Sequence, residues 1–92
     1  MKAILTYTTM IDGKPVEQTR LFNTTKAKKI SDVKNSFNKK VQEIYITDKG
    51  IIFLHNINKG TLEIADQKQI KKWIGENEPE KYIKFFGEVE EG

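Results

Sequence analysis

The chain has 92 residues, of which 37% are hydrophobic, 32% are charged and none is cysteine. Disulfides and thiolate metal sites are therefore excluded, and two separate cores would each be too small to be stable, so one domain is predicted. No apolar run reaches the roughly 18 residues of a membrane span, which makes the cytoplasm the expected compartment. The net charge is +3, but segment 20–40 carries +6 and segment 75–92 carries −4, a polarity that selects partners by charge.

The first part of the chain predicts a β-hairpin. Residues 2–11 alternate between apolar and threonine-rich positions, a pattern typical of a half-buried strand, and Tyr7 falls on the apolar side. Asp12-Gly13 is a strong signal for a two-residue turn. Residues 16–22 then predict the return strand, whose polar content indicates one exposed face.

The next segment predicts an amphipathic helix that ends at about Lys40. Residues 23–25 (Asn-Thr-Thr) supply candidate N-caps. At ~100° per residue, five apolar residues fall within about 60° of one line, and lysines occupy the opposite side and a flank. The five apolar residues are Ala27, Ile30, Val33, Phe37 and Val41.

Three further strands are predicted between residues 42 and 65, separated by turns that contain glycine. Residues 42–47 alternate between apolar and polar positions. Residues 51–57 make up the most apolar strand, which is therefore expected in the interior of the sheet. A short strand over residues 61–65 completes this group.

Two helices are predicted at the end of the chain. Asp66 is the expected N-cap of the first, which carries Trp73 on an apolar stripe and which Gly75 is expected to end. Pro79 suits the first turn of the second helix, and Gly87 suits its end.

The resulting order of elements is ββα-βββ-αα, which predicts an α+β fold. Its sheet is expected to be antiparallel or mixed, with the helices packed on one face. Residues 1–87 are expected to form the single domain, and residues 88–92 an acidic tail that frays. No motif in the chain points to a known family.

The sequence contains no set of residues that indicates catalysis. His55 is the only histidine, and it lies on the same side of its predicted strand as Phe53, which favours a hydrogen-bonded structural role. Glycine-rich phosphate loops and the nucleophile motif G-x-S-x-G are absent. One histidine and scattered carboxylates do not make a metal site. We therefore expect no enzyme activity, no cofactor and no metal.

The lysine-bearing side of the predicted helix is the main candidate binding surface. Its functional interpretation is contact with phosphates or with an acidic protein surface, and the competing interpretation is a solvated face that keeps the chain soluble. Tyr45 lies on the polar face of its strand and is the best candidate for stacking on a nucleic-acid base. The predicted partner-binding residues are Lys28, Lys29, Lys39, Lys40, Arg20 and Tyr45.

Two functional hypotheses follow. The first is a small non-enzymatic protein that blocks or regulates a protein or nucleoprotein partner, by analogy with inhibitors and accessory proteins of phages and mobile elements. In this hypothesis the contact is made either by the lysine face or by the acidic tail, residues 88–92, which would imitate phosphate in a basic groove. The alternative is direct nucleic-acid binding through the lysine-rich helix face. An enzyme would require a catalytic set around His55 that spacing does not reveal.

Overall fold

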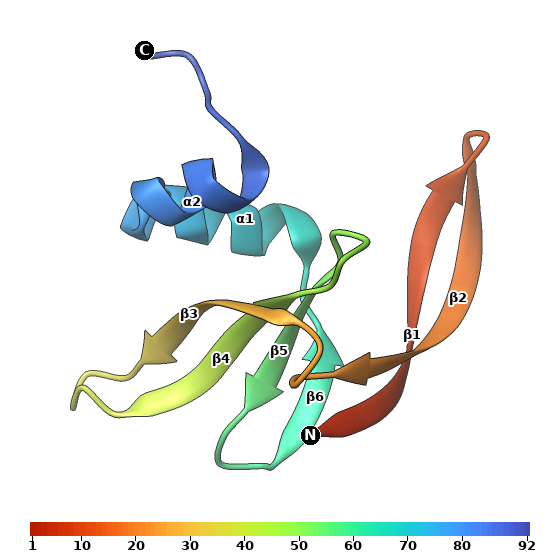
Figure 1. Cartoon of the computed structure of the whole chain (residues 1–92), viewed down its shortest axis with the longest axis horizontal. Helices are drawn as coiled ribbons and strands as arrows, with labels where there is room; N and C mark the ends of the chain where they lie inside the picture. Colours follow the sequence, from red (N-terminus) through yellow and green to blue (C-terminus); the bar gives the residue numbers. More distant parts are fainter.

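The structure is a computed structural model that describes all 92 residues (Figure 1). It is an α+β fold, as predicted, but the order is six strands followed by two helices. The strands are β1 (Lys2–Ile11), β2 (Lys14–Asn23), β3 (Lys28–Lys34), β4 (Lys40–Ile46), β5 (Ile52–Asn56) and β6 (Thr61–Ile64). The helices are α1 (Gln67–Asn77) and α2 (Pro79–Phe86).

The strands form two antiparallel sheets. β1 and β2 make a two-stranded sheet, and the other four strands make a second sheet in the order β3-β4-β5-β6. Every neighbouring pair in the larger sheet is joined directly by a turn, so the sheet is a meander. β5 lies in its interior between β4 and β6, as the apolar run of residues 51–57 predicted.

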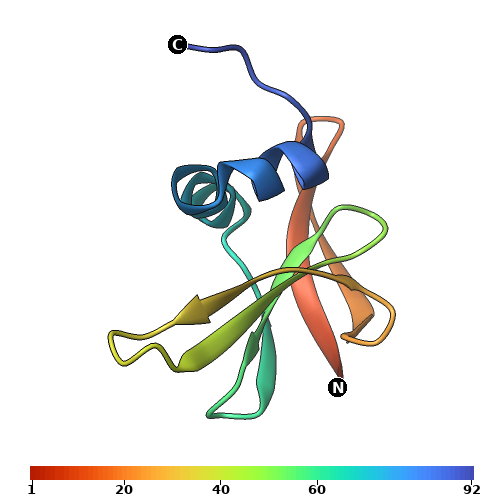
Figure 2. The same ribbon diagram turned by 60° about the vertical axis from the view of Figure 1, so that its left-hand side comes forward.

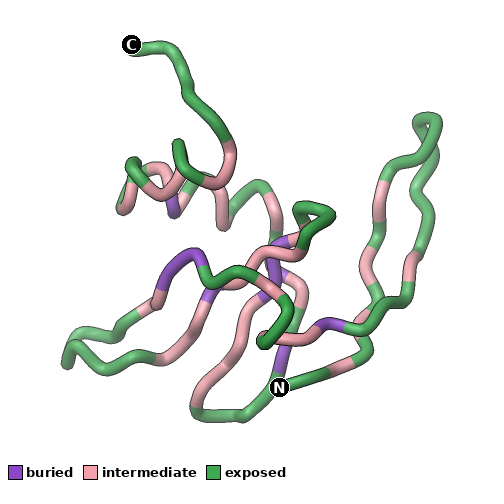
Figure 3. Tube along the Cα trace, viewed as in Figure 1, coloured by how far each residue is buried: buried purple, intermediate pink, exposed green.

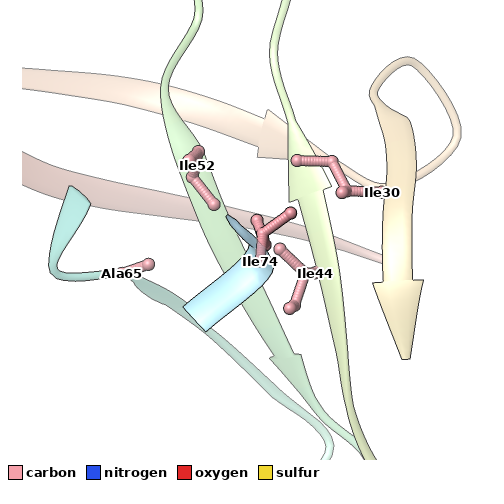
Figure 4. Close-up of a cluster of buried hydrophobic side chains, with 5 residues drawn as sticks. All are labelled: Ile30, Ile44, Ile52, Ala65 and Ile74. Carbon is pink, nitrogen blue, oxygen red and sulfur yellow. The ribbon is translucent and has the colours of Figure 1, made fainter. Parts of the chain in front are cut away.

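One face of the four-stranded sheet is covered by the two helices. Five buried side chains meet there, and Trp73, Tyr82 and Phe86 pack around them from the helices. Figure 4 shows Ile74 of α1 directed at the isoleucines of the sheet. The five buried residues are Ile30, Ile44, Ile52, Ala65 and Ile74.

The opposite face of the same sheet packs against the base of the β1–β2 hairpin. Phe22, Phe53 and Leu62 are buried there, because Phe53 points away from the helices while its neighbour Ile52 points towards them. The ring of Phe22 meets the ring of Phe53 edge-on at 5.2 Å, and the ring of Tyr7 in the same way at 5.8 Å. These contacts fix the hairpin to the sheet.

The predicted helix over residues 24–40 is wrong: this segment forms a loop, strand β3, a tight turn and the start of β4. The turn is made by Asn35, whose side-chain Oδ1 accepts the N–H groups of Phe37 at 2.9 Å and Lys39 at 3.1 Å. Asn38 adopts a positive φ of 62°, which no helix accommodates. The asparagines therefore break the segment where the helix was predicted to continue.

A β-bulge explains why the segment has an apparent helical period. Lys29 pairs with Tyr45 and Ser31 pairs with Ile44, so Ile30 is an extra residue in β3. The bulge turns Ile30 and Val33, three positions apart, towards the same helix-covered face. Apolar residues at this spacing imitate one side of a helix.

The helical part of the chain begins as predicted but extends further. The Asp66 carboxylate accepts the N–H of Gln69 at 3.1 Å and caps α1. The helix does not end at Gly75 but continues to Asn77. Gly75 serves instead as a contact point between the helices, because a Cβ placed there would lie 3.3 Å from the ring of Tyr82 in α2.

Two segments extend from the packed body. The radius of gyration is 14.0 Å, against about 12 Å for a compact chain of this length. Figures 1 and 2 show that the β1–β2 hairpin rises beside the helices and that the C-terminal residues leave the body in a separate direction. Both segments are mostly exposed along their length (Figure 3). Neither helix is long and apolar enough to cross a membrane.

Candidate functional site

A network of charged and polar side chains lies on the sheet face opposite the helices, centred on Glu43. Its Oε1 accepts hydrogen bonds from Nδ1 of His55 at 2.8 Å and from the hydroxyl of Tyr45 at 3.2 Å. Its Oε2 accepts from Nζ of Lys40 at 3.0 Å and from Nζ of Lys29 at 3.4 Å. Because these residues come from β3, β4 and β5, the carboxylate cross-links three strands.

The network changes the ionisation of its members. Partial burial by itself raises the pKa of Glu43, but the hydrogen bonds from His55 and Lys40, with the charge of Lys40, outweigh it and lower the pKa to about 2. The pKa of Lys29 is raised chiefly by its contact with Asp32, at 3.1 Å. Burial and the neighbouring Glu43 raise the pKa of Tyr45. Glu43 therefore remains a carboxylate held by four donors.

Three of the predicted partner-binding residues are committed to this network. Lys29 and Lys40 are paired with acids, so their charges are partly neutralised within the fold. Tyr45 lies nearly parallel to Phe53, with ring centroids 5.4 Å apart, and its hydroxyl is bonded to Glu43. Its ring is half-buried, and one of its faces lies against Phe53.

The other three predicted residues lie outside this network. Lys28 begins β3 and is exposed, and Lys39 lies in the β3–β4 turn. Arg20 lies on β2, where its Nη1 donates to the carbonyl oxygen of Thr19 at 2.8 Å. Because the expected helix is absent, the four lysines of the set do not line one face of a helix.

His55 is held as the sequence suggested, by a hydrogen bond within the fold. Nδ1 contacts Glu43, so the ring is oriented by a carboxylate, and the residues lie directly opposite each other on β4 and β5. No group of three or more His, Asp or Glu side chains lies close enough together to hold a metal ion.

A second feature, not predicted from the sequence as a binding surface, is the hairpin arm, which we define as residues 4–21. Along β1 every second residue is exposed, from Ile4 through Met10. Ile4 is 72% exposed and lies directly opposite Leu21, which is 63% exposed. Met10, at 66% exposed, lies opposite Pro15. The outer face of the arm is therefore an open surface with apolar pairs at both ends.

The middle of this outer face is polar but almost uncharged. Thr6 lies opposite Thr19, and their hydroxyls are hydrogen-bonded at 2.9 Å. Thr8 lies opposite Glu17, which is the only charged residue among the four outward-facing cross-strand pairs of the arm. A signal for this surface was present in the sequence, since Ile4 and Met10 occupy the threonine-rich side of an alternating strand.

The third feature is a basic groove at the base of the arm, about 380 Å³ in volume. It opens between β2, the loop that follows it and the β4–β5 turn. Its rim carries four cations that make no ion pair with any acid of the chain, and its walls are largely apolar. The four cations are Lys2, Arg20, Lys26 and Lys49.

Comparison of the chain with protein-family models, with curated proteins and with solved structures gave no match.

Proposed function

We propose that the chain is a small non-enzymatic binding protein that blocks or regulates a protein partner, and that it makes this contact with the outer face of the hairpin arm. The observation that carries the proposal is the exposed cross-strand pair Ile4–Leu21, reinforced by Met10 at the other end of the same face. Large apolar side chains exposed on one open face favour association with another macromolecule.

The energetics of the arm support this use. An isolated two-stranded hairpin is marginally stable in water, so its outer face gains most when a partner covers it. Burying about 100 Å² of apolar surface on each of three such side chains would contribute roughly 7 kcal/mol before the cost of association. The base of the arm is already fixed by Phe22, which lowers the ordering cost on binding.

The charge of this face favours protein over nucleic acid. Nucleic-acid surfaces are recognised mainly through Lys and Arg contacts to phosphates. The outer face consists of four cross-strand pairs, from Ile4–Leu21 to Met10–Pro15. Its one charged residue is Glu17, and it carries no cation. The partner surface that complements this face is a protein surface of low charge with apolar contacts for Ile4, Leu21 and Met10.

A blocking or regulating role agrees with the size of the chain. A protein of 92 residues that presents one projecting surface acts on a partner by covering it. Small inhibitors and accessory proteins of phages and mobile elements have this build, an analogy of size and composition. The earlier alternative, nucleic-acid binding through a lysine-rich helix face, lacks its surface because residues 28–34 form a strand.

The test is affinity capture from the native host with three forms of the protein. The arm variant is Ile4→Thr with Met10→Thr, which keeps β-forming residues but removes two exposed apolar side chains. The matched control is Phe37→Thr with Val89→Thr, which removes two equally exposed apolar side chains elsewhere. We expect a saturable protein partner that the wild type and the control retain and that the arm variant loses at least tenfold.

Two outcomes would overturn the proposal. The first is equal recovery of the same proteins by the arm variant and the control. The second is a concentration-dependent dimer of the chain alone, measured by light scattering, that the arm variant abolishes, because a second copy would then be the occupant of this face.

A further inference from the structure

We propose that the basic groove binds a nucleotide unit, holding its phosphate with the cations of the rim and its base against the apolar wall. Leu21 borders both this groove and the hairpin arm's outer face, but the variants that test the two proposals share no residue. At about 380 Å³ the groove lies within the usual size range of small-ligand sites, about 300–1,000 Å³.

The cations of the rim indicate an anionic ligand. Lys2, Arg20, Lys26 and Lys49 come from four separate segments of the chain and converge on one groove. The lining includes one acid, Asp48, so it has a net charge of +3, equal to that of the whole chain. By contrast, Lys29 and Lys40 are paired with acids. The fold thus pairs Lys29 and Lys40 with acids and leaves the four cations of the groove without an acid partner.

Arg20 is the residue best placed to select phosphate. Its Nη1 donates to the carbonyl oxygen of Thr19 at 2.8 Å, which holds the guanidinium against the backbone of β2. A guanidinium has five N–H donors, so several remain for oxygen atoms of a ligand. Arginine pairs with phosphate in a bidentate manner, whereas the three lysines act as point charges around it.

The apolar wall indicates that the ligand is more than a simple anion. Phe22 and Ile51 line the groove beside the half-buried ring of Tyr7, whose orientation is fixed by its edge-on contact with Phe22. Inorganic phosphate gains nothing from such a surface, whereas a nucleobase stacks on aromatic and aliphatic side chains. A phosphate joined to a flat ring uses both parts of the lining.

The groove fits an unpaired base better than a duplex. A base reaches the wall only if it enters between β2 and the β4–β5 turn, and a base inside a double helix is stacked and paired. A free nucleotide and a nucleotide within a single strand share the required chemistry. The size of the ligand distinguishes the two.

The test measures binding of the intact protein to four probes at 50 and 200 mM salt. The probes are inorganic phosphate, a mononucleotide, a mixed-sequence single-stranded oligonucleotide and the corresponding duplex. The groove variant is Arg20→Ala with Lys49→Ala. The matched control is Lys59→Ala with Lys68→Ala, which removes the same charge from exposed positions outside the groove and outside every ion pair.

We expect the groove variant to lose at least tenfold in affinity for the mononucleotide or the single strand, and the control to lose less than threefold. With four cations at the site, affinity for a single strand should fall with salt at a logarithmic slope of about 3 or less. If the mononucleotide binds as tightly as the single-stranded oligonucleotide, the ligand is a free nucleotide. If the oligonucleotide binds more tightly than the mononucleotide, the ligand is single-stranded nucleic acid.

Tyr7→Leu provides a second readout that separates the wall from the rim. It should weaken nucleotide binding several-fold and leave the salt dependence unchanged, since no charge is removed. Thermal unfolding of each variant checks that the fold is intact. The proposal is wrong if no nucleotide probe binds at 50 mM salt, if the groove and control variants lose affinity equally, or if duplex and inorganic phosphate bind as well as the single strand.

Discussion

The side-chain amide of Gln67 pairs with the backbone of Ile52 as a neighbouring strand would. The N–H of Ile52 donates to Oε1 of Gln67 at 2.8 Å, and Nε2 of Gln67 donates to the carbonyl oxygen of Ile52 at 2.7 Å. Nε2 also donates to the carbonyl oxygen of Ala65 at 2.7 Å. The first residue of α1 therefore ties the helix to the start of β5, where the pairing with β6 ends.

Replacing Gln67 by alanine should lower the free energy of unfolding by about 2–3 kcal/mol, because three hydrogen bonds are lost and the N–H of the buried Ile52 loses its partner, while the carbonyl oxygen of Ile52 keeps the N–H of Ala65. Urea unfolding measures the change. The control is Gln69→Ala on the same helix, whose exposed side chain should contribute less than about 0.5 kcal/mol. Equal losses for the two variants would contradict this role for Gln67.

Glu43 should make the stability of the protein depend on pH in the acid range. Its pKa falls from an ordinary value of 4.5 to about 2 in the folded state, so the folded protein binds this proton more weakly than the unfolded chain. The contribution is complete above pH 4.5 and is lost as the pH falls through about 2. Its size is about 3 kcal/mol, since one pKa unit corresponds to about 1.4 kcal/mol.

Glu43→Gln should remove this contribution and flatten the stability profile between pH 4.5 and 2. Unfolding measured at several pH values across this range gives the comparison. Glu63→Gln is the control, because Glu63 is exposed on β6 and forms no ion pair. A Glu63→Gln profile as flat as that of Glu43→Gln would show that the network is not the cause.

Two adjacent residues of β2 should differ sharply in their effect on stability. Phe22 is 2% exposed and joins the hairpin to Phe53, so Phe22→Ala should cost about 3–4 kcal/mol. Leu21 points to the outer face, and Leu21→Ala should cost less than about 1 kcal/mol. Chemical denaturation of both variants tests this. Similar losses would mean that the outer face is packed.

The helix-covered core should depend on Ile74. Its side chain is fully buried among the sheet isoleucines, and Ile74→Ala should lower the free energy of unfolding by about 3–4 kcal/mol. Ile83→Ala on α2 is the control, since Ile83 is exposed and should cost less than about 1 kcal/mol. Thermal unfolding distinguishes the two, with a fall in Tm of more than about 10 °C expected only for Ile74→Ala.

Signals that act within a few residues led to correct predictions. Asp12 and Gly13 both have positive φ, as a two-residue hairpin turn requires, and they fix the register of β1 and β2. Asp66 caps α1 and Pro79 begins α2. Each of these depends on the conformational preference of the residue itself, which is written in the sequence.

The helix predicted over residues 24–40 shows where such reasoning fails. The spacing of Ile30 and Val33 matches a helical period, but a bulge in β3 produces the same result. The β-branched side chains at both positions and the asparagine turn at Asn35 and Asn38 were signals for strands. A bulge depends on the register with β4, and periodicity alone does not contain that register.

The sequence by itself determined the α+β class, the first hairpin and the starts of the two helices, because turns, helix starts and alternation are local properties. The tertiary structure decided which charges are free. Lys29 meets Glu43 because the pairing of β3 with β4 places it there, and Lys40 reaches the same carboxylate along β4, whereas Lys26 and Lys49 line the groove without an acid partner. The same packing left Ile4 and Leu21 exposed. Contacts between residues distant in the chain follow from the register and packing of whole strands, which no short stretch of sequence encodes.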